Sequence, residues 1–163
     1  MGSEMCIRDR IMLVYGASVA IGNLYGGRLA DRLGPISALT LIFAGLVAIL
    51  LVLSVSAVHP VAAVLTILVW GAFAFGNVPG LQVYVVKLAE RYVPEAVDVA
   101  SGLNIAAFNI GIALGSVVGG QVVTHLALTD TAWIGAIIVL AALVLTRLSG
   151  RLDQRRAARL AGA

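Results

Sequence analysis

Long apolar stretches separated by short polar connections dominate the pattern of this chain. Five stretches are long enough to cross a bilayer core about 30 Å thick, which takes roughly 20 apolar residues per helix. They cover residues 11–30, 36–58, 61–86, 98–123 and 131–148. Ionisable side chains lie only near the ends of these stretches, as the cost of placing a charge in hydrocarbon requires. The pattern therefore predicts an all-α integral membrane protein with five transmembrane helices.

Composition agrees with this reading and argues against an enzyme. Hydrophobic residues make up 61% of the 163 residues and charged residues only 12%, which is outside the range of soluble domains. The short connections leave no room for a soluble domain with an active site. The only cysteine, Cys6, lies outside the five stretches, so we expect no catalytic residues, no metal site and no cofactor.

The positive charges predict the orientation of the chain. Apart from Arg8 and Arg10, the Lys and Arg residues flank the first and third connections, close the fifth stretch at Arg147, or lie in the tail, residues 149–163. In a five-span zigzag these positions fall on one side, which the positive-inside rule makes cytoplasmic. We therefore expect a multi-pass protein of the cell (inner or plasma) membrane with a basic cytoplasmic tail. Cations so close to the bilayer predict contact with lipid headgroups, and no nucleic acid partner is expected.

The first ten residues, "MGSEMCIRDR", do not fit the apolar pattern that follows them. No helix-start signal lies where this polar decapeptide meets Ile11. Back-translation of the decapeptide yields a string that resembles the transposon-end adapter used in preparing sequencing libraries. We therefore expect residues 1–10 to be an adapter artefact, which is excluded from reasoning about the fold, and the gene to continue upstream of Ile11.

One polar connection carries a recognisable motif, "GGRLADRLGP" at residues 26–35. It resembles the signature loop of the major facilitator superfamily, Gly-x-Leu-Ala-Asp-Arg-x-Gly followed by two basic residues. Gly27, Asp31, Arg32 and Gly34 match, whereas the two basic residues are absent. We expect Gly27 to allow close helix approach and Gly34 to form a turn. The resemblance implies that Asp31 latches one helix bundle to the other, and the alternative is that Asp31 and Arg32 only cap a tight turn.

The resemblance extends over residues 11–150 and implies helices eight to twelve of a twelve-helix transporter. The stretch "SGLNIAAFNIGIALGSVVGG" resembles the eleventh helix of arabinose and drug efflux permease-like members. The segments "IGNLYGGRLA" and "IGIALGSVVG" share an Ile-Gly-x-x-x-Gly frame in helices that should run in opposite directions. Such a relation is typical of a six-helix bundle built from inverted three-helix repeats.

Polar and small residues inside the apolar stretches are the candidates for a substrate cavity. Around Pro79 the third stretch should kink or loosen, because proline lacks an amide hydrogen and clashes with the preceding turn. Asn104 and Asn109 lie about 140° apart around a helix, so they cannot both face one cavity, and which of them does is left open. The cavity candidates are Asn77, Gln82, Asn104 and Asn109, and the hinge or packing candidates are Gly76, Pro79, Gly80, Gly111 and Gly115.

The predicted function is therefore that of a fragment of a secondary active transporter. The resemblance implies proton-coupled efflux of a small sugar-like or drug-like solute by alternating access, with the missing N-terminal half of the same transporter as partner. No carboxylate lies deep in the five stretches, so the proton-carrying residue is expected outside them. The alternatives are an uptake facilitator of the same fold and a non-transporting five-span membrane scaffold or subunit.

Overall fold

The computed structural model describes residues 2–56, 58–127 and 130–161, and the side chains of residues 9–56, 58–127 and 130–159. Five long helices and one short 3-10 turn account for nearly all of them, and these residues contain no strand. The elements are α1 (Gly2–Leu33), α2 (Pro35–Ser56), α3 (Pro60–Tyr92), η1 (Pro94–Ala96), α4 (Val97–His125) and α5 (Asp130–Ala161). The all-α prediction is confirmed.

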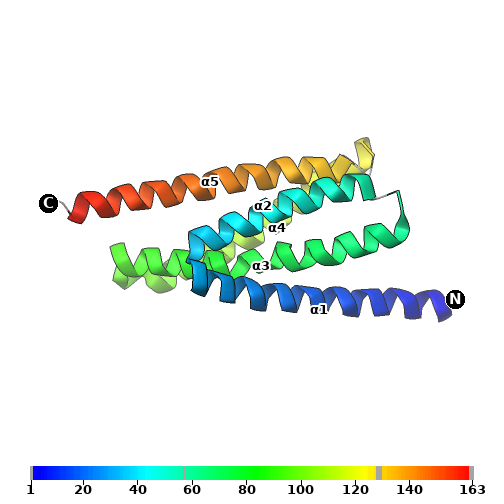
Figure 1. Ribbon diagram of the computed structural model, residues 1–163, viewed down its shortest axis with the longest axis horizontal. Helices are drawn as coiled ribbons and strands as arrows, with labels where there is room; N and C mark the ends of the chain where they lie inside the picture. The colour runs from blue at the N-terminus through cyan, green and yellow to red at the C-terminus, as the bar shows by residue number, and fades with distance from the viewer. Residues whose placement is uncertain (1, 57, 128–129, 162–163) are drawn as a thin grey trace.

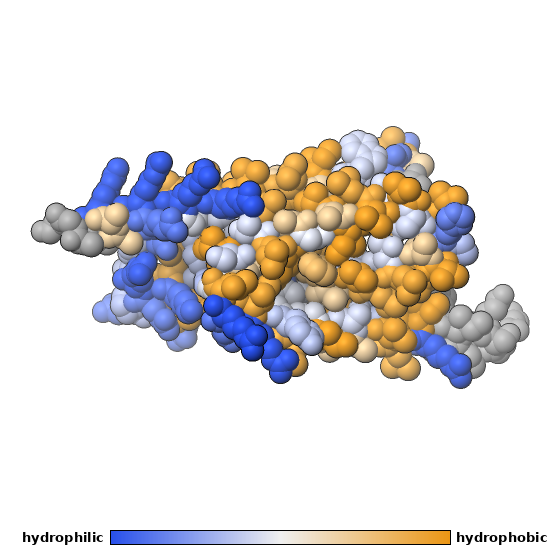
Figure 2. Space-filling view, viewed as in Figure 1, coloured by the Kyte–Doolittle hydropathy of each residue, from blue (hydrophilic) through white to orange (hydrophobic). Residues whose placement is uncertain are grey.

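The five helices run alternately in opposite directions (Figure 1). As a result α1, α3 and α5 end on the same side of the bundle, and the cations that follow or close these helices gather there. Figure 2 shows hydrophilic residues concentrated at this end and a broad apolar surface between the two ends. This distribution suits a bundle whose middle contacts lipid and whose ends contact water.

Four of the five helices, α2 to α5, are long and apolar enough to cross a membrane. Helix α1 has the length but falls short in hydropathy, since Tyr15, Asn23, Tyr25 and Arg28 lie among its apolar residues. The predicted crossing of residues 11–30 therefore stays a prediction. The side chain of Cys6 and residues 162–163 of the predicted tail lie outside the described residues.

Helix boundaries follow local sequence signals. Pro35, Pro60 and Pro94 each begin a helix, a position where the missing amide hydrogen costs nothing. Gly34 separates α1 from α2 with a φ of 81°, the left-handed region that suits glycine. The turn predicted at Gly34 is therefore present.

Replacing Gly34 with alanine is expected to lower the stability of the bundle by about 1–2 kcal/mol, because a Cβ is strained in the left-handed region. No neighbouring atom lies within 4 Å of that Cβ position, so the effect is purely conformational. Thermal unfolding in detergent measures it. Gly16→Ala is the matched control, since Gly16 is helical with equally open surroundings and should gain stability. Equal melting temperatures for the two variants would contradict the prediction.

The tightest contact in the bundle is the crossing of the parallel helices α1 and α3. Small residues repeat every fourth position on both facing stripes: Gly22, Gly26 and Ala30 on α1, and Ala72, Gly76 and Gly80 on α3. A Cβ at Gly22 would collide with the carbonyl of Ala72, and one at Gly26 with the carbonyl of Gly76. The two backbones are therefore in contact, as in small-xxx-small helix pairs.

A small apolar core joins α2 to α3 and α5. It consists of the buried residues Leu39, Ile42, Phe43, Leu46 and Leu143, with Trp70, Phe73 and Tyr84 packed against it. Helix α4 has no buried residue. It therefore forms an open flank of the bundle.

Three sequence-based predictions concern Pro79, Gly27 and the basic tail. Helix α3 continues through Pro79 without interruption, and the kink or loosening predicted there stays a prediction. The Cβ of Pro79 lies 3.8 Å from a Cβ built on Gly27, so this proline packs against α1 while the neighbouring turns keep the helix intact. Close approach occurs at Gly26 rather than at Gly27, where an added Cβ would make only ordinary contact. The basic tail continues α5 as far as Ala161.

Candidate functional site

A hydrogen-bonded group of three polar side chains links α3 to α4. The Gln82 amide nitrogen donates to the Ser101 hydroxyl at 2.5 Å, and the Asn104 amide nitrogen donates to the Gln82 carbonyl oxygen at 2.7 Å. All three residues are half-buried. Gln82 thus has both ends of its amide engaged by α4, which satisfies groups that would be costly to leave unpaired in hydrocarbon. We call Gln82, Ser101 and Asn104 the amide cluster.

The other two amide candidates are not part of this group. Asn77 is half-buried and donates to the carbonyl of Ala74 in its own helix at 2.7 Å. Asn109 is exposed and donates to the carbonyl of Ile105, also in its own helix, at 2.9 Å. The structure therefore brings Gln82 and Asn104 together and leaves Asn77 and Asn109 apart, with Asn109 on the open flank of α4.

The predicted packing glycines of α4 line a wide apolar groove. The groove has a volume of about 650 Å³, and among the residues that line it are Leu50, Ile67, Trp70, Gly111, Gly115, Gly119, Gly135 and Ile138. A Cβ built on Gly111 or Gly115 meets no atom within 4 Å. The close helix approach expected at these two glycines is therefore absent among the described residues. By contrast Gly76 and Gly80 are buried against α1 and α2.

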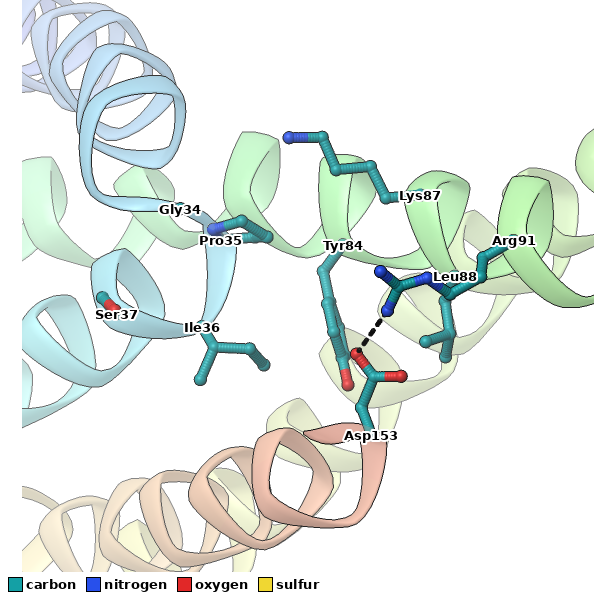
Figure 3. Close-up of a pocket in the computed structure, with 9 residues that line it drawn as sticks. All are labelled: Gly34, Pro35, Ile36, Ser37, Tyr84, Lys87, Leu88, Arg91 and Asp153. Atoms are coloured by element: carbon teal, nitrogen blue, oxygen red, sulfur yellow. Dashed lines mark ion pairs between the residues drawn. The ribbon is translucent and has the colours of Figure 1, made fainter. Parts of the chain in front are cut away.

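A second hollow, of about 430 Å³, lies where the basic ends of the helices meet (Figure 3). It is formed by the start of α2 with Tyr84, Lys87 and Arg91 of α3 and Asp153 of α5. The Asp153 carboxylate accepts a hydrogen bond from the Tyr92 hydroxyl at 2.9 Å and lies 3.8 Å from the Arg91 guanidinium. These contacts hold the extended end of α5 against the end of α3.

The loop motif lies beside this hollow. Asp31 and Arg32 are exposed, and Arg91 with Asp153 is the one ion pair among the side chains that the structure describes. Asp31 therefore has no ionic partner in the described part of the chain. The capping role and the latch role of Asp31 both remain predictions.

Three contacts between helices in the structure were not predicted from the sequence. Ser101 lies three residues before Asn104 and so on the same helix face, which is a signal that could have placed it in the amide cluster. Gly22 and Gly26 show small-xxx-small spacing, which could have indicated the α1–α3 crossing. The contact of Tyr92 with Asp153 joins residues 61 positions apart, and no local pattern announces it.

Comparison with known proteins assigns the chain to a family. Residues 11–163 match the family model described as Major Facilitator Superfamily. The chain is 52% identical over 145 residues to an uncharacterized MFS-type transporter, YtbD, of Bacillus subtilis (strain 168), with 89% of this chain and 36% of that protein covered. It is 36% identical over 144 residues to the inner membrane transport protein YdhP of Escherichia coli (strain K12), with 86% of this chain and 35% of that protein covered.

The chain thus spans about a third of the length of these relatives. No solved structure matches it. The match to the family model covers every apolar helix and leaves out only the polar decapeptide. The apolar helices and the relatives indicate a multi-pass membrane protein. The chain belongs to the major facilitator superfamily, a family of transporters rather than enzymes.

Proposed function

We propose that this chain is the C-terminal part, helices eight to twelve, of a transporter that expels a small sugar-like or drug-like solute by alternating access. The observation that carries the proposal is the amide cluster. It places uncharged hydrogen-bonding groups between two helices of an otherwise apolar bundle, and polar groups within a membrane commonly mark a substrate path. Amides and hydroxyls suit a neutral solute with several hydrogen-bonding groups.

The apolar groove supports the proposal that a sixth helix completes the bundle. Helix α1 packs its Gly22 and Gly26 against α3, and α4 carries the same Ile-Gly-x-x-x-Gly frame at Gly111 and Gly115. If α1 and α4 are equivalent members of inverted repeats, a helix equivalent to α3 belongs in the groove beside α4. In the longer protein this helix would precede α1.

Gly115→Leu is therefore expected to affect stability differently in residues 11–163 alone and in the full-length transporter. In residues 11–163 alone it should change the melting temperature little, because the site is open. In the full-length transporter it should destabilise the protein by about 1–3 kcal/mol, the usual cost of overpacking. Detergent melting curves of both proteins measure this. Equal, small shifts in the two would contradict a sixth helix at this position.

We infer that proton coupling, if the full protein has it, uses a carboxylate outside the described helices. Within the described helices, Asp31, Asp98 and Asp130 lie close to helix ends, and Asp153 lies in the polar part of α5 beyond its apolar stretch. The distribution of cations supports a cytoplasmic C-terminus in the cell membrane. The missing N-terminal half would supply the rest of the cavity, and the solute and the lipid bilayer are the other proposed partners.

The adapter interpretation of residues 1–10 belongs to the same proposal. It is supported by the start of the family match at residue 11, although α1 runs without a break from Gly2 to Leu33. Sequencing the gene from source DNA, with a library made without transposon ends, tests it. We expect coding sequence for further membrane helices to replace the decapeptide. The same ten codons in that read would refute the adapter origin.

Direction of transport is tested with the full-length gene expressed in cells. Radiolabelled neutral sugars and drug-like solutes are supplied, and their steady-state accumulation is measured. Efflux predicts that expression lowers the accumulation of at least one solute and that collapsing the proton gradient restores it. A rise in accumulation on expression would instead identify an uptake facilitator.

A further inference from the structure

The cytoplasmic extension of α5 carries a stripe of arginines. Arg147, Arg151, Arg155 and Arg159 recur at every fourth position, and all four are exposed. Four residues advance a helix by about 40° beyond one full turn, so the four side chains sweep about 120° of one face. Figure 2 shows a row of hydrophilic side chains projecting outward from this end of the molecule. We call these four residues the arginine stripe.

The arginine stripe points away from the body of the protein. About 120° around the helix from the middle of the stripe, Gly150 is buried, and a Cβ built on it would lie 2.8 Å from the Ile36 side chain of α2. Asp153, the carboxylate nearest to the stripe in sequence, is turned to Tyr92 and Arg91. Within the part of the chain that the structure describes, no arginine of the stripe forms an ion pair. The four charges are therefore available to an external partner.

The same face of α5 is apolar on the membrane side of the stripe. Leu140, Val144 and Leu148 are 48%, 58% and 50% exposed, and by helix periodicity they lie within the sector that the arginines occupy. The face thus changes from exposed aliphatic side chains to arginines without changing direction. A helix that passes from the acyl chains into the headgroup layer of one leaflet is expected to carry aliphatic side chains first and cationic side chains after them.

Distances along the helix agree with that order. Arg151 lies about 6 Å beyond Arg147 at 1.5 Å per residue, and the headgroup layer of a leaflet is roughly 5–8 Å thick. Arg147 and Arg151 can therefore contact phosphates directly. Arg155 lies about 6 Å further out, within a Debye length of roughly 8–10 Å at physiological salt.

We propose that the arginine stripe binds anionic phospholipid headgroups of the adjoining leaflet. An acidic protein segment would satisfy the same charges, but it does not account for the continuity of the arginines with the lipid-exposed aliphatic face. A cation near an anionic membrane surface contributes about 1 kcal/mol, which corresponds to about a five-fold change in binding. Losing the whole stripe should therefore weaken binding at least five-fold.

The test uses the purified 163-residue chain and phosphatidylglycerol, with phosphatidylcholine as the neutral lipid. Native mass spectrometry of lipid titrations in detergent measures the affinity for each lipid. For the variant carrying R147Q, R151Q, R155Q and R159Q we expect phosphatidylglycerol binding to weaken at least five-fold, about one such factor, with phosphatidylcholine binding unchanged. The R28Q and R32Q pair, which removes two exposed cations at the same end of the bundle, should weaken phosphatidylglycerol binding less than the loss of the four arginines does.

A second variant keeps the test decisive if the glutamine variant fails to fold. With lysine at all four positions the charge is retained, so binding of phosphatidylglycerol should stay within about three-fold of the original chain and should weaken in 0.5 M salt. Equal affinity of the original chain for the two lipids would overturn the proposal, and so would an undiminished preference in a folded glutamine variant. Binding of polyglutamate by the stripe without any phosphatidylglycerol preference would overturn it in favour of an acidic protein partner.

Discussion

Replacing Gly26 with alanine is expected to be among the most destabilising additions of a single methyl group to the bundle, at about 3 kcal/mol. A Cβ at this position would collide with the main-chain carbonyl of Gly76 in α3. A side chain could rotate away, but a carbonyl within a helix can move only if the whole helix moves. The two helices would have to separate along the stripe that also holds Gly22 and Gly80.

A matched substitution separates this effect from helix propensity. Alanine is favoured over glycine within a helix by about 1 kcal/mol, so Gly102→Ala in α4, where no atom lies within 4 Å of the added Cβ, should stabilise the chain. The melting temperatures of both variants in detergent are compared with that of the original chain. A Gly26→Ala variant as stable as Gly102→Ala would show that α1 and α3 do not meet at this distance.

Replacing Gln82 with leucine is expected to have the largest effect on transport. The substitution removes the amide that both other members of the amide cluster contact, leaving the Asn104 amide and the Ser101 hydroxyl without their hydrogen bonds to α3. Hydrogen bonds between membrane helices contribute about 0.6 kcal/mol on average and up to about 1.7 kcal/mol. A stability loss of about 1–2 kcal/mol is therefore expected, too small by itself to prevent folding.

In the full-length transporter the same variant should lower the initial rate of solute transport at least about ten-fold, the size of effect expected when about 1.4 kcal/mol of binding or positioning is lost. Asn109→Leu is the control of the same chemical type, because Asn109 bonds only within its own helix. A double-mutant cycle of Gln82→Leu with Asn104→Leu measures their coupling. Normal transport by Gln82→Leu at normal expression would remove the amide cluster from the proposed solute path.

Local signals in the sequence predicted a large part of the fold. The apolar stretches indicated helices α2 to α5, because a helix in lipid must satisfy its own backbone and cover it with apolar side chains. Gly34 was predicted as a turn between two such stretches, and the structure gives it the left-handed φ that only glycine adopts freely. Pro79 lies within the continuous helix α3 and packs beside Gly27, and the kink predicted there stays a prediction.

For the candidate site residues, the sequence determined which polar side chains are present and which helix face each occupies. It did not determine their hydrogen-bond partners. Periodicity was enough to separate Asn104 from Asn109, and the structure does place them in different surroundings. That Asn104 meets Gln82 depends on how α3 and α4 cross, and a helix pattern carries no information about the crossing. Ser101 shares the face of Asn104 and became significant only once its distance to Gln82 was known.

The sequence by itself thus determined the helical class, the positions of most connections, the single basic side and membership of a transporter family. Only the tertiary structure decided which glycines bring backbones together: Gly22 and Gly26 do so, whereas Gly111 and Gly115 line an open groove. It also decided that Asp153 binds Tyr92 across the end of the bundle. The physical reason is that hydropathy and helix periodicity act within a few turns, whereas contacts between helices depend on packing among residues far apart in the chain.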